Sequence, residues 1–593
     1  MVHEFFINRP SFEVRQEQHK MEQLTDLQRC SKAVYLSCAI PRSQNGTRLV
    51  ELLPGSGTQP ISCIMRPVVL ELPQSPSFPS YEALSYVWGD PTFLQPIIAN
   101  DGHLGITRNL HAALYHLRHP QKSRTIWIDA LCINQYDVDE RNHQISLMRS
   151  IYSNARRVIS WLGEFDDESN IAMDYLSSDA WAGLNRLDAP ANVINALASL
   201  FSRPYWTRVW IIQEVAVARD ILIVCGDRTL LWEMLQQFVP LTRAISGVSG
   251  GVWSALARPR KLMRLTLRDE QDVIDILREA IDLKASVPAD KVYGLLGLFP
   301  AGLKDRLTID YRQPLCKVVE DVLKAYLDES QGSEVGADLS FMCVFPPLTG
   351  KGSDNGDNAS WLPDIRNRVA GLAEWYDPSK GKVWSGCISL QYPALHVPAV
   401  PLGQIRATLG PFQTKRASLS HNFARTGRLF QASELRAVAM EGIRNRRPDE
   451  TPTEHDVAFF HMVAGTRIFT QTRGRLALSH EELWSAVVES EASGVEPMQR
   501  VHDQFEIVFE RLHDRKLLLL SDGSVGLGPS ESCAGDFVFV LRTCSLPMVL
   551  RQTVSGEGEI ATSTYSFIGP GYVDRAMRGE AMDSATEVQL RIR

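Results

Sequence analysis

The sequence predicts an α/β protein in which helices flank a parallel sheet, followed by a helical segment and a strand-rich C-terminal region. Strand-like and helix-like patterns alternate between residues 81 and 226. Most of these strands are continuously apolar, which is typical of parallel strands covered on both faces. Apolar residues then recur at helical spacing up to residue 345, and short strands with Gly and Ser turns follow from residue 392.

Four short apolar runs in the alternating region are the predicted strands of the parallel sheet. A Gly or Gly-Asp pair ends three of them, and this marks the point where the chain turns away from the sheet. In chain order the strands are residues 83–88, 125–129, 157–162 and 221–225.

Two helices between these strands have clear start signals. Asn109 is the predicted cap of one helix, and Asp137, followed by Glu140, opens the other. A further helical insertion is predicted at 169–200, before the last strand. The predicted apolar faces are Leu110, Ala113, Leu114 and Leu117 in the first helix, and Ile145, Met148, Ile151 and Tyr152 in the second.

The segment 203–217 predicts one helix with a tryptophan-rich face. Ser202 can cap this helix, and Pro204 suits its first turn. Glu214 lies on the apolar face, where an unpaired charge is costly, so its carboxylate is either paired or used in chemistry. An ion pair with Arg203 or Arg208 is the structural alternative. At a 3.6-residue period the shared face contains Trp206, Trp210, Gln213, Glu214 and Val217.

The expected domain division follows these changes of pattern. Short strands are predicted in the N-terminal lead-in at 33–38 and 61–70, and a Pro- and Gly-rich connector begins at residue 346. The predicted parts are 1–74 (lead-in), 75–230 (alternating region), 231–345 (helical region), 346–380 (linker) and 381–593 (C-terminal α+β region).

Composition restricts the classes of function. The chain has 593 residues, 44% hydrophobic and 22% charged, as folded proteins do. A net charge of −7 gives no basic excess for phosphates, so no nucleic-acid partner is expected. No signal-peptide pattern or membrane-spanning run is seen, which predicts a cytoplasmic protein. The ten cysteines form no Cys-x-x-Cys pair, and no metal site is expected.

Several common catalytic motifs are missing from the sequence. There is no phosphate-binding Gly-x-x-x-x-Gly-Lys-Ser/Thr loop, no Gly-x-Gly-x-x-Gly after a strand, no Gly-x-Ser-x-Gly and no His-Glu-x-x-His. ATP hydrolysis, hydride transfer on a dinucleotide fold and zinc hydrolysis are therefore disfavoured. No bound cofactor is expected to be required.

Three segments resemble the fungal heterokaryon incompatibility (HET) domain family. They are Tyr81-Glu-Ala-Leu-Ser-Tyr-Val-Trp-Gly-Asp90, Ile126-Trp-Ile-Asp-Ala-Leu-Cys-Ile-Asn-Gln135 and Arg203-Pro-Tyr-Trp-Thr-Arg-Val-Trp-Ile-Ile-Gln-Glu214. Residues 290–297, 360–364 and 572–580 are similar to recurring parts of full-length members. The resemblance implies a role in non-self recognition and programmed cell death, with an unidentified recognition partner and with self-association as an open alternative.

The order of elements also resembles, more distantly, a TIR domain, which has a flavodoxin-like fold. Trp210-Ile-Ile-Gln-Glu214 has the Trp-x-x-x-Glu spacing of the helix that carries the catalytic glutamate in NAD-cleaving TIR domains. The segment 163–202 is an insertion relative to that pattern. This resemblance implies that Glu214 is catalytic and that NAD is a possible substrate.

Loops that follow parallel strands are expected to form the ligand site with the tryptophan helix. Cleavage of the nicotinamide–ribose bond gives an oxocarbenium-like centre, which the Glu214 carboxylate can stabilise. Aromatic faces suit the flat rings, and Asp129 or Asn134 can bind ribose. The candidate residues around the ligand are Trp88, Gly89, Asp90, Asp129, Asn134, Trp206 and Trp210.

Each candidate has a structural alternative, and so has the function. Trp88 and Trp210 also suit a core, whereas Asp129 and Asn134 also suit a loop or turn. The competing function is a non-catalytic module that triggers death by binding partners, and a third alternative is an accessory protein without an incompatibility role. The sequence alone leaves these three open.

Overall fold

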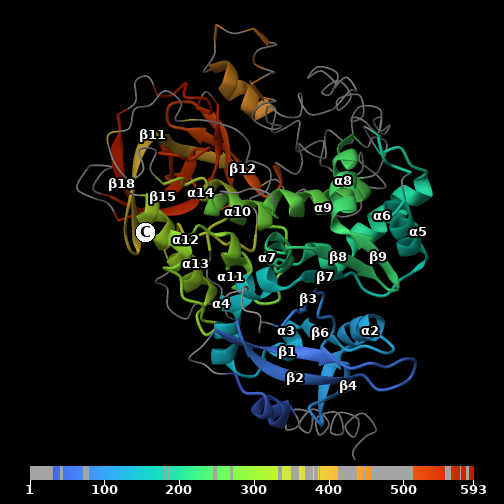
Figure 1. Ribbon diagram of the computed structural model, residues 1–593. Helices are drawn as coiled ribbons and strands as arrows, with labels where there is room; N and C mark the ends of the chain where they lie inside the picture. Colours follow the sequence, from blue (N-terminus) through green and yellow to red (C-terminus); the bar gives the residue numbers. More distant parts are fainter. Residues whose placement is uncertain are drawn as a thin grey trace, which may run out of the picture. The chain divides into compact units, whose positions relative to one another are not determined.

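The computed structural model divides the chain into two units, each described here by itself (Figure 1). The first unit contains Met1–Asp272, Asp282–Pro300 and Thr308–Gln313. The second contains Val273–Ile281, Ala301–Leu307 and Pro314–Arg593. The structure describes residues 31–40, 45–70, 79–178, 180–184, 187–244, 250–266, 272–330, 337–348, 359–367, 378, 385, 388–411, 437–445, 448–449, 451–452, 455, 458–459, 512–554, 563–574, 576–582 and 586–593. The boundaries expected from the sequence at 74, 230, 345 and 380 stay predictions.

The first unit is built on a nine-stranded sheet whose central strands are parallel. β3 (Glu82–Ser85) runs parallel to β6 (Arg124–Trp127) on one side and to β7 (Arg157–Trp161) on the other. β8 (Ile221–Cys225) continues the parallel set beside β7. The four strands predicted from apolar runs are thus confirmed as the parallel part of the sheet. Their spatial order is β6-β3-β7-β8, so the second predicted strand lies on the other side of the first from the third.

Further strands, paired antiparallel except for the parallel pair β2 and β4, extend the sheet on both sides in the order β5-β4-β2-β1-β6-β3-β7-β8-β9. β1 (Gly46–Leu52) lies between β6 and β2 (Ser62–Val69). A hairpin of β4 (Leu94–Ala99) and β5 (Gly102–Thr107) joins through β4, and β9 (Arg228–Leu231) pairs with β8. β2 confirms the strand predicted at 61–70.

The strand predicted at 33–38 is wrong, because residues 31–37 form a helix. Val34, Tyr35 and Cys38 are buried there while Leu36 is 69% exposed. Burial at positions i, i+1 and i+4 follows a helical rather than a strand period. The β-branched and aromatic residues of this segment favour a strand, but the packing of one helical face outweighs that preference.

The helices on either side of β6 agree with their predicted faces. α2 (Arg108–Leu117) and α4 (Val138–Asn154) bury every apolar residue predicted for them, and a single helical turn, α3 (Asp129–Cys132), directly follows the strand. Asp137 caps α4 as predicted, accepting from the backbone N–H groups of Asp139 and Glu140. The cap of α2 is Thr107 instead of Asn109, whose amide donates to Val87 O at 2.5 Å.

The insertion predicted at 169–200 consists of α5 (Asp167–Leu176) and α6 (Ala191–Ser202). The single helix predicted for 203–217 is wrong. It is divided into the 3-10 turn η1 (Pro204–Thr207) and the short helix α7 (Ile211–Ala216). The break arises because Lys284 binds the chain between them: its N–H donates to Thr207 O at 2.5 Å and its C=O accepts from Val209 N at 3.0 Å.

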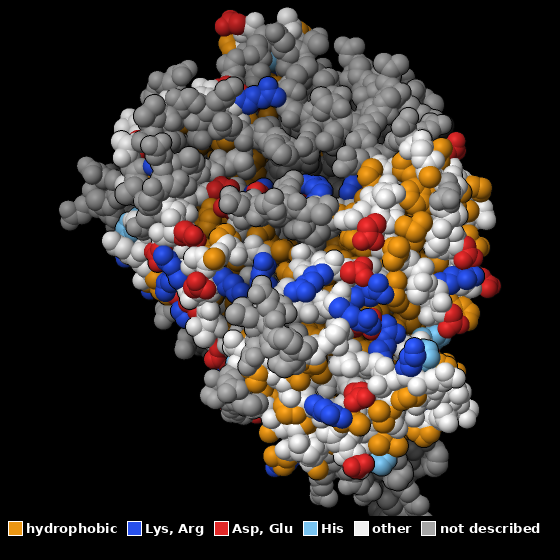
Figure 2. All heavy atoms as spheres, in the orientation of Figure 1, with side chains coloured by type: hydrophobic (Ala, Val, Ile, Leu, Met, Phe, Trp, Pro, Cys, Tyr) orange, Lys and Arg blue, Asp and Glu red, His pale blue; other side chains and the backbone are white. Residues whose placement is uncertain are grey.

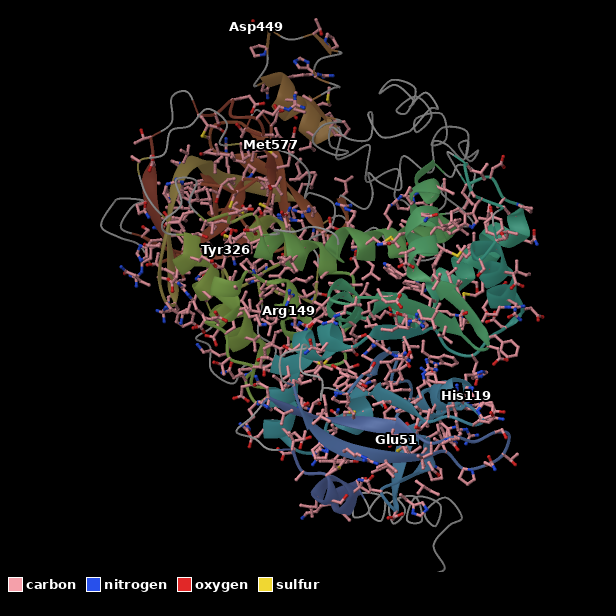
Figure 3. All side chains as sticks on the ribbon, in the orientation of Figure 1. Glu51, His119, Arg149, Tyr326, Asp449 and Met577 are labelled. Carbon is pink, nitrogen blue, oxygen red and sulfur yellow. The ribbon has the colours of Figure 1, made fainter. Side chains whose placement is uncertain are left out.

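Further helices complete the first unit. α8 (Trp232–Phe238) and η2 (Val239–Ala244) follow β9, and α9 (Gly250–Thr266) packs against α6 and α7. The returning segment Asp282–Pro300 carries α11 (Asp290–Tyr293) and η3 (Leu296–Leu298). Arg149 on α4 donates to Gly297 O, which ties this segment to the sheet's helical layer (Figure 3).

The second unit combines helices with strands that pair antiparallel except for β16 and β18, and its C-terminal part is rich in strands as predicted. Its helices are α10 (Val273–Ala280), α12 (Ala301–Lys304), α13 (Leu315–Ser330) and α14 (Phe341–Val344). Its strands are β10 (Ser389–Gln391), β11 (Ala394–Leu409), β12 (Arg515–Leu520), β13 (Val525–Pro529), β14 (Phe537–Leu541), β15 (Met548–Val554), β16 (Thr564–Pro570), β17 (Tyr572–Val573) and β18 (Val588–Ile592).

Strand pairing in the second unit closes on itself. β14, β15, β16, β18 and β11 pair in that order, and β11 pairs back to β14. β11 can serve several partners because it is 16 residues long, with β18 beside its first half and β12 beside its end. Full closure removes free edges from these five strands. The core beneath them includes Ile405, Leu518, Leu520, Val538, Val549 and Val573.

Basic and acidic side chains are interspersed on the visible face of the described residues, as the small net charge of −7 leads one to expect (Figure 2). Within the described part of the chain, no helix is long and apolar enough to cross a membrane.

Candidate functional site

The candidate site begins where β3 and β7 end. Ser85, the last residue of β3, pairs in register with Ser160 of β7, so the two hydroxyls belong to neighbouring strand ends. The Tyr205 hydroxyl, from η1, lies 3.0 Å from Ser85 Oγ and donates to Ser160 Oγ at 2.8 Å. Ser160, Tyr205 and Ser85 are all buried. The first turn after the insertion thus places a tyrosine over the carboxyl ends of both strands.

Glu214 completes this group from α7. Its side chain is 2% exposed, and Ser85 Oγ donates to Glu214 Oε2. The nearest cation is Arg208, whose Nη1 lies 4.0 Å from the same oxygen. Of the two arginines expected as a partner, Arg208 therefore faces Glu214, whereas Arg203 pairs with Asp166 at 2.9 Å.

Burial dominates the electrostatics of Glu214. It raises the pKa of the carboxyl to about 7, against 4.5 for an ordinary glutamate, while the Arg208 charge and the Ser85 hydrogen bond act in the opposite direction. The negative charge of Asp129 adds to the rise. Near neutral pH the acid and the carboxylate are therefore both populated, a condition suited to proton transfer.

Arg208 is shared by two carboxyl groups. Its guanidinium donates to Tyr86 O, and the charges of Glu214 and Asp129 raise its pKa against the effect of burial. Burial raises the pKa of Asp129 as well, with Arg208 opposing. The buried hydroxyl of Tyr86 faces Asp129 without a hydrogen bond of ordinary geometry. One cation therefore stands among two acids with raised pKa values.

Trp88 and Asp129, two of the predicted ligand residues, are in contact at the edge of this cluster. Trp88 Nε1 donates to Asp129 Oδ2 at 2.7 Å, and its ring is 39% exposed. Gly89 follows with φ +81°, a backbone conformation that favours glycine. The loop after β3 can therefore turn away at Gly89 while it leaves the indole at the surface beside Asp129.

The side chains of the other predicted residues form their hydrogen bonds with partners other than Glu214. Asn134 forms a turn, with its N–H donating to Glu140 Oε1 and its side chain accepting from Tyr136 N. Asp90 accepts from Thr92 N within its own loop. Trp206 is buried, its indole donates to Leu200 O, and it packs on Phe201 and Tyr205. Trp210 instead hydrogen-bonds Asp290, which lowers the pKa of that carboxyl against burial. Their ligand roles stay predictions.

Sequence reasoning missed four side chains of the cluster: Ser85, Tyr86, Ser160 and Tyr205. Serine and tyrosine hydroxyls carry no spacing pattern, and each of these looks like an ordinary strand or helix residue. The usable signal was position, since Ser85 and Ser160 come at or one residue before the ends of two neighbouring parallel strands. Tyr205 was hidden because the chain was expected to be helical there.

The cluster has the chemistry of a proton-transfer or charge-stabilising site. It contains two carboxyl groups, one guanidinium and a set of buried hydroxyls, with an aromatic ring at its edge. Among the described residues no group of His, Cys, Asp and Glu has the arrangement of a metal site. Cys132 is buried, and burial holds the pKa of its thiol far above the range of a reactive nucleophile.

Two family profiles match separate regions of the chain. The heterokaryon incompatibility protein (HET) profile matches residues 81–214, which begins at β3 and ends at Glu214. The Het-6 beta-barrel domain profile matches residues 492–590, the region that contributes β12 to β18. The two matches fall on different structural units.

One curated relative extends the similarity over nearly the whole chain. Heterokaryon incompatibility protein 6, OR allele, of Neurospora crassa is 25% identical over 680 aligned residues, which cover 93% of this chain and 96% of the relative. Together with the two profile matches, this makes the chain similar to heterokaryon incompatibility proteins along most of its length. No solved structure matches it.

Proposed function

We propose that this chain acts in fungal non-self recognition and triggers programmed cell death through its HET domain. Its similarity to a Neurospora heterokaryon incompatibility protein along most of both chains supports this role. The separate match of the strand-rich region supports a division of labour in which the second unit restrains or assembles the first. The non-self partner would be a protein.

We further propose that the HET domain cleaves NAD at the nicotinamide–ribose bond, with Glu214 as the catalytic residue. The observation that carries this proposal is the position of Glu214 at the carboxyl ends of β3 and β7, the two strands between which the strand order reverses. Open α/β sheets bind ligands at such a switch point. The parallel order 2-1-3-4 is also the start of the flavodoxin-like order, which supports the TIR-like comparison.

The chemistry requires little from the protein beyond charge and position. Nicotinamide leaves as a neutral ring, so general acid help is unnecessary, and positive charge builds up on the ribose. A carboxylate held near the anomeric carbon stabilises that charge or orients water. In this scheme Glu214 supplies the carboxylate, Asp129 binds ribose hydroxyls, and Trp88, which is 39% exposed and hydrogen-bonded to Asp129, offers a stacking face. NAD is a substrate in this scheme, and no resident cofactor takes part.

The raised pKa gives the scheme a pH dependence. Only the ionised form of Glu214 can stabilise the developing cation, and burial holds its pKa at about 7. Cleavage is therefore expected to rise with pH through about 7 and then level off.

The second candidate is a non-catalytic module that causes death by binding partners. The observation that favours it is the burial of Glu214, which is 2% exposed and hydrogen-bonded by Ser85 as a purely structural carboxyl would be. In that case the cluster stabilises the HET domain and the exposed loops make the contacts.

A paired assay separates the two. Wild type, Glu214→Gln and the control Glu233→Gln, which changes an exposed carboxylate on α8, are overexpressed in a fungal host while cell death and cellular NAD are measured. Nicotinamide release from NAD is followed with the purified full-length proteins. The catalytic proposal expects Glu214→Gln to lose at least about 100-fold of the release rate and to stop killing. A folded Glu214→Gln protein that kills as wild type does would establish the interaction module instead.

A further inference from the structure

Three buried hydroxyls connect Glu214 to the next strand of the sheet. The contacts run from Glu214 Oε2 to Ser85 Oγ, from Ser85 Oγ to the Tyr205 hydroxyl at 3.0 Å, and from Tyr205 to Ser160 Oγ at 2.8 Å. All four residues are nearly inaccessible to solvent. The hydrogens inside this row must therefore be arranged among its own atoms.

Counting hydrogens leaves two consistent arrangements. Each hydroxyl has one hydrogen to donate. In one arrangement Tyr205 donates to Ser160, so the Ser85–Tyr205 contact needs the Ser85 hydrogen. The contact between Ser85 and Glu214 is then a hydrogen bond only if Glu214 is protonated and donates. In the opposite arrangement Ser160 donates to Tyr205, Tyr205 to Ser85, and Ser85 to an ionised Glu214.

We infer that Ser160, Tyr205 and Ser85 form a hydroxyl chain that can hydrogen-bond Glu214 either as the neutral acid or as the carboxylate, and that reverses its hydrogen bonds when Glu214 ionises. The Tyr205–Ser160 contact has the direction of the acid arrangement, whereas the Ser85–Glu214 contact has the direction of the carboxylate arrangement, so the same atomic positions suit both. Reversal moves no proton along the chain. Each hydroxyl rotates, and the single proton that leaves Glu214 passes to water.

The titratable groups that face Glu214 from the surrounding elements leave its acid and carboxylate forms close in free energy. Arg208 favours the carboxylate, whereas Asp129 on α3 disfavours it. The other neighbours are the phenols of Tyr86 after β3, Tyr152 on α4 and Tyr205 on η1, and burial raises the pKa of each. They stay neutral over the physiological range, so they contribute hydrogen bonds and no charge. The hydroxyl chain can therefore decide between two forms that lie close in free energy.

This inference deepens the proposed NAD cleavage, on which its consequence for catalysis rests. A neutral Glu214 avoids an uncompensated buried charge while the site is empty. The pyridinium ring of NAD carries a positive charge, and its arrival would stabilise the carboxylate and reverse the chain. The residues Ser160, Tyr205 and Ser85 are then positioning residues that couple substrate charge to the ionisation of the catalytic group.

The test measures the ionisation of Glu214 directly, in the full-length protein and without NAD. Infrared difference spectra over a pH series from about 5 to about 9 follow the carbonyl band of the Glu214 acid, identified as the band that Glu214→Gln removes. Ser160→Ala removes the acceptor of the acid arrangement, so the midpoint should fall by about one pH unit. Ser85→Ala removes the donor to the carboxylate, so the midpoint should rise by about one pH unit.

Control variants keep the result interpretable. Ser160→Thr retains the hydroxyl and should restore the wild-type midpoint, and Ser146→Ala on the exposed face of α4 should leave it unchanged. If Ser160→Ala does not fold, Tyr205→Phe replaces it, because it also removes the acceptor for Ser85 and should lower the midpoint. Midpoints that do not move, or that move in the same direction in Ser160→Ala and Ser85→Ala, overturn the hydroxyl chain.

The two proposals fail in different ways. Opposite midpoint shifts together with no nicotinamide release would keep the hydroxyl chain and remove NAD cleavage. Nicotinamide release that depends on Glu214, with unmoved midpoints, would keep NAD cleavage and remove the hydroxyl chain.

Discussion

Arg208 is the residue on which both acids of the cluster depend at the scale of single side chains. Its charge lowers the pKa of Glu214 and of Asp129, in each case as the largest effect opposing burial. Both carboxyls still have raised pKa values, so the one cation does not offset their desolvation. Burial of an acid cluster with a single cation is costly for stability, and such sites are commonly functional.

Replacement of Arg208 by Met should therefore destabilise the protein in a pH-dependent way. Without the cation the folded-state pKa of Glu214 rises above about 7, while the unfolded-state value is unchanged. A raised folded pKa stabilises below the unfolded value and loses that contribution as pH rises through the folded value. The deficit relative to wild type should thus grow from about pH 6 to about pH 8 and reach on the order of 3 kcal/mol. Urea unfolding at several pH values measures it.

Arg203→Met is the matched control for this change. Arg203 pairs with Asp166, whose carboxylate is 58% exposed, and donates to the backbone oxygens of Leu162 and Glu164, so its loss should lower stability with little dependence on pH between 6 and 8. A pH-independent deficit in Arg208→Met would contradict the electrostatic account.

How far the sequence could predict the site depends on the kind of residue. Glu214 was predictable because a carboxylate within an apolar, tryptophan-rich segment has to be explained. Trp88 and Asp129 were predictable because they follow parallel strands, and the structure joins them by a hydrogen bond. Ser85 and Tyr205 were not predictable, since their role comes only from the meeting of β3, β7 and η1 in space.

At the scale of elements, the sequence pattern predicted the helices and strands whose burial follows from their own apolar residues. The four parallel strands and the faces of α2 and α4 were predicted because apolar periodicity directly reports burial. Prediction failed between η1 and α7, where the backbone of Lys284, some 75 residues later in the chain, takes the hydrogen bonds that would continue the helix. A contact of that sequence separation leaves no mark on local periodicity.

The turn after β8 offers a test of packing at the element scale. Gly226 has φ +55°, and a Cβ there would lie 2.4 Å from Phe165 Cδ1 and 2.9 Å from Phe165 Cβ. Gly226→Ala should lower stability by about 1–3 kcal/mol, because both backbone strain and a displaced loop result. The control is Gly183→Ala, at φ +78° with nothing within 4 Å, which should cost about 1 kcal/mol from strain alone. Equal losses of stability for the two variants in thermal unfolding would show that Phe165 moves aside without a cost in free energy.

The N-terminal helix, α3 and α4 are joined by one arginine. Arg48 of β1 is 1% exposed, binds the backbone oxygens of Cys38 and Cys132, and forms a two-pronged pair with Glu140 at 2.6 and 3.1 Å. Arg48→Met leaves a carboxylate and two carbonyls without their donor, so we expect a loss of about 3–5 kcal/mol.

Arg66→Met is the control for Arg48→Met, measured in the same urea titrations. Arg66 is 66% exposed and reaches Glu51 at 3.4 Å, so its removal should change stability by less than about 1 kcal/mol. Similar losses in the two variants would mean that the buried pair contributes no more than a surface pair.

At the scale of the whole molecule, the HET match covers only part of the sheet to which its strands belong. Residues 81–214 contain β3 to β7 and α7, but β1 lies beside β6 and β8 lies beside β7 in the same sheet. Lys284, which shapes the segment before α7, also lies outside the match. The HET motifs therefore mark the site, and a larger part of the chain builds the fold around it.

Truncation tests this difference. A fragment of residues 75–230 lacks β1 and β2 and exposes the edge of β6, so it should be unfolded or aggregated. A fragment of residues 31–313 retains the sheet and Lys284 and should be folded by circular dichroism and amide exchange. A well-folded 75–230 fragment would show that the parallel strands are sufficient by themselves.

The interleaving of the two units limits how such a gene can evolve. The chain changes unit after residues 272, 281, 300, 307 and 313, so each unit takes its residues from several separate stretches. A single crossover between two alleles cannot exchange one unit intact unless it also replaces fragments of the other. Variation in recognition should thus accumulate by point substitution and loop change, with wholesale module swapping disfavoured.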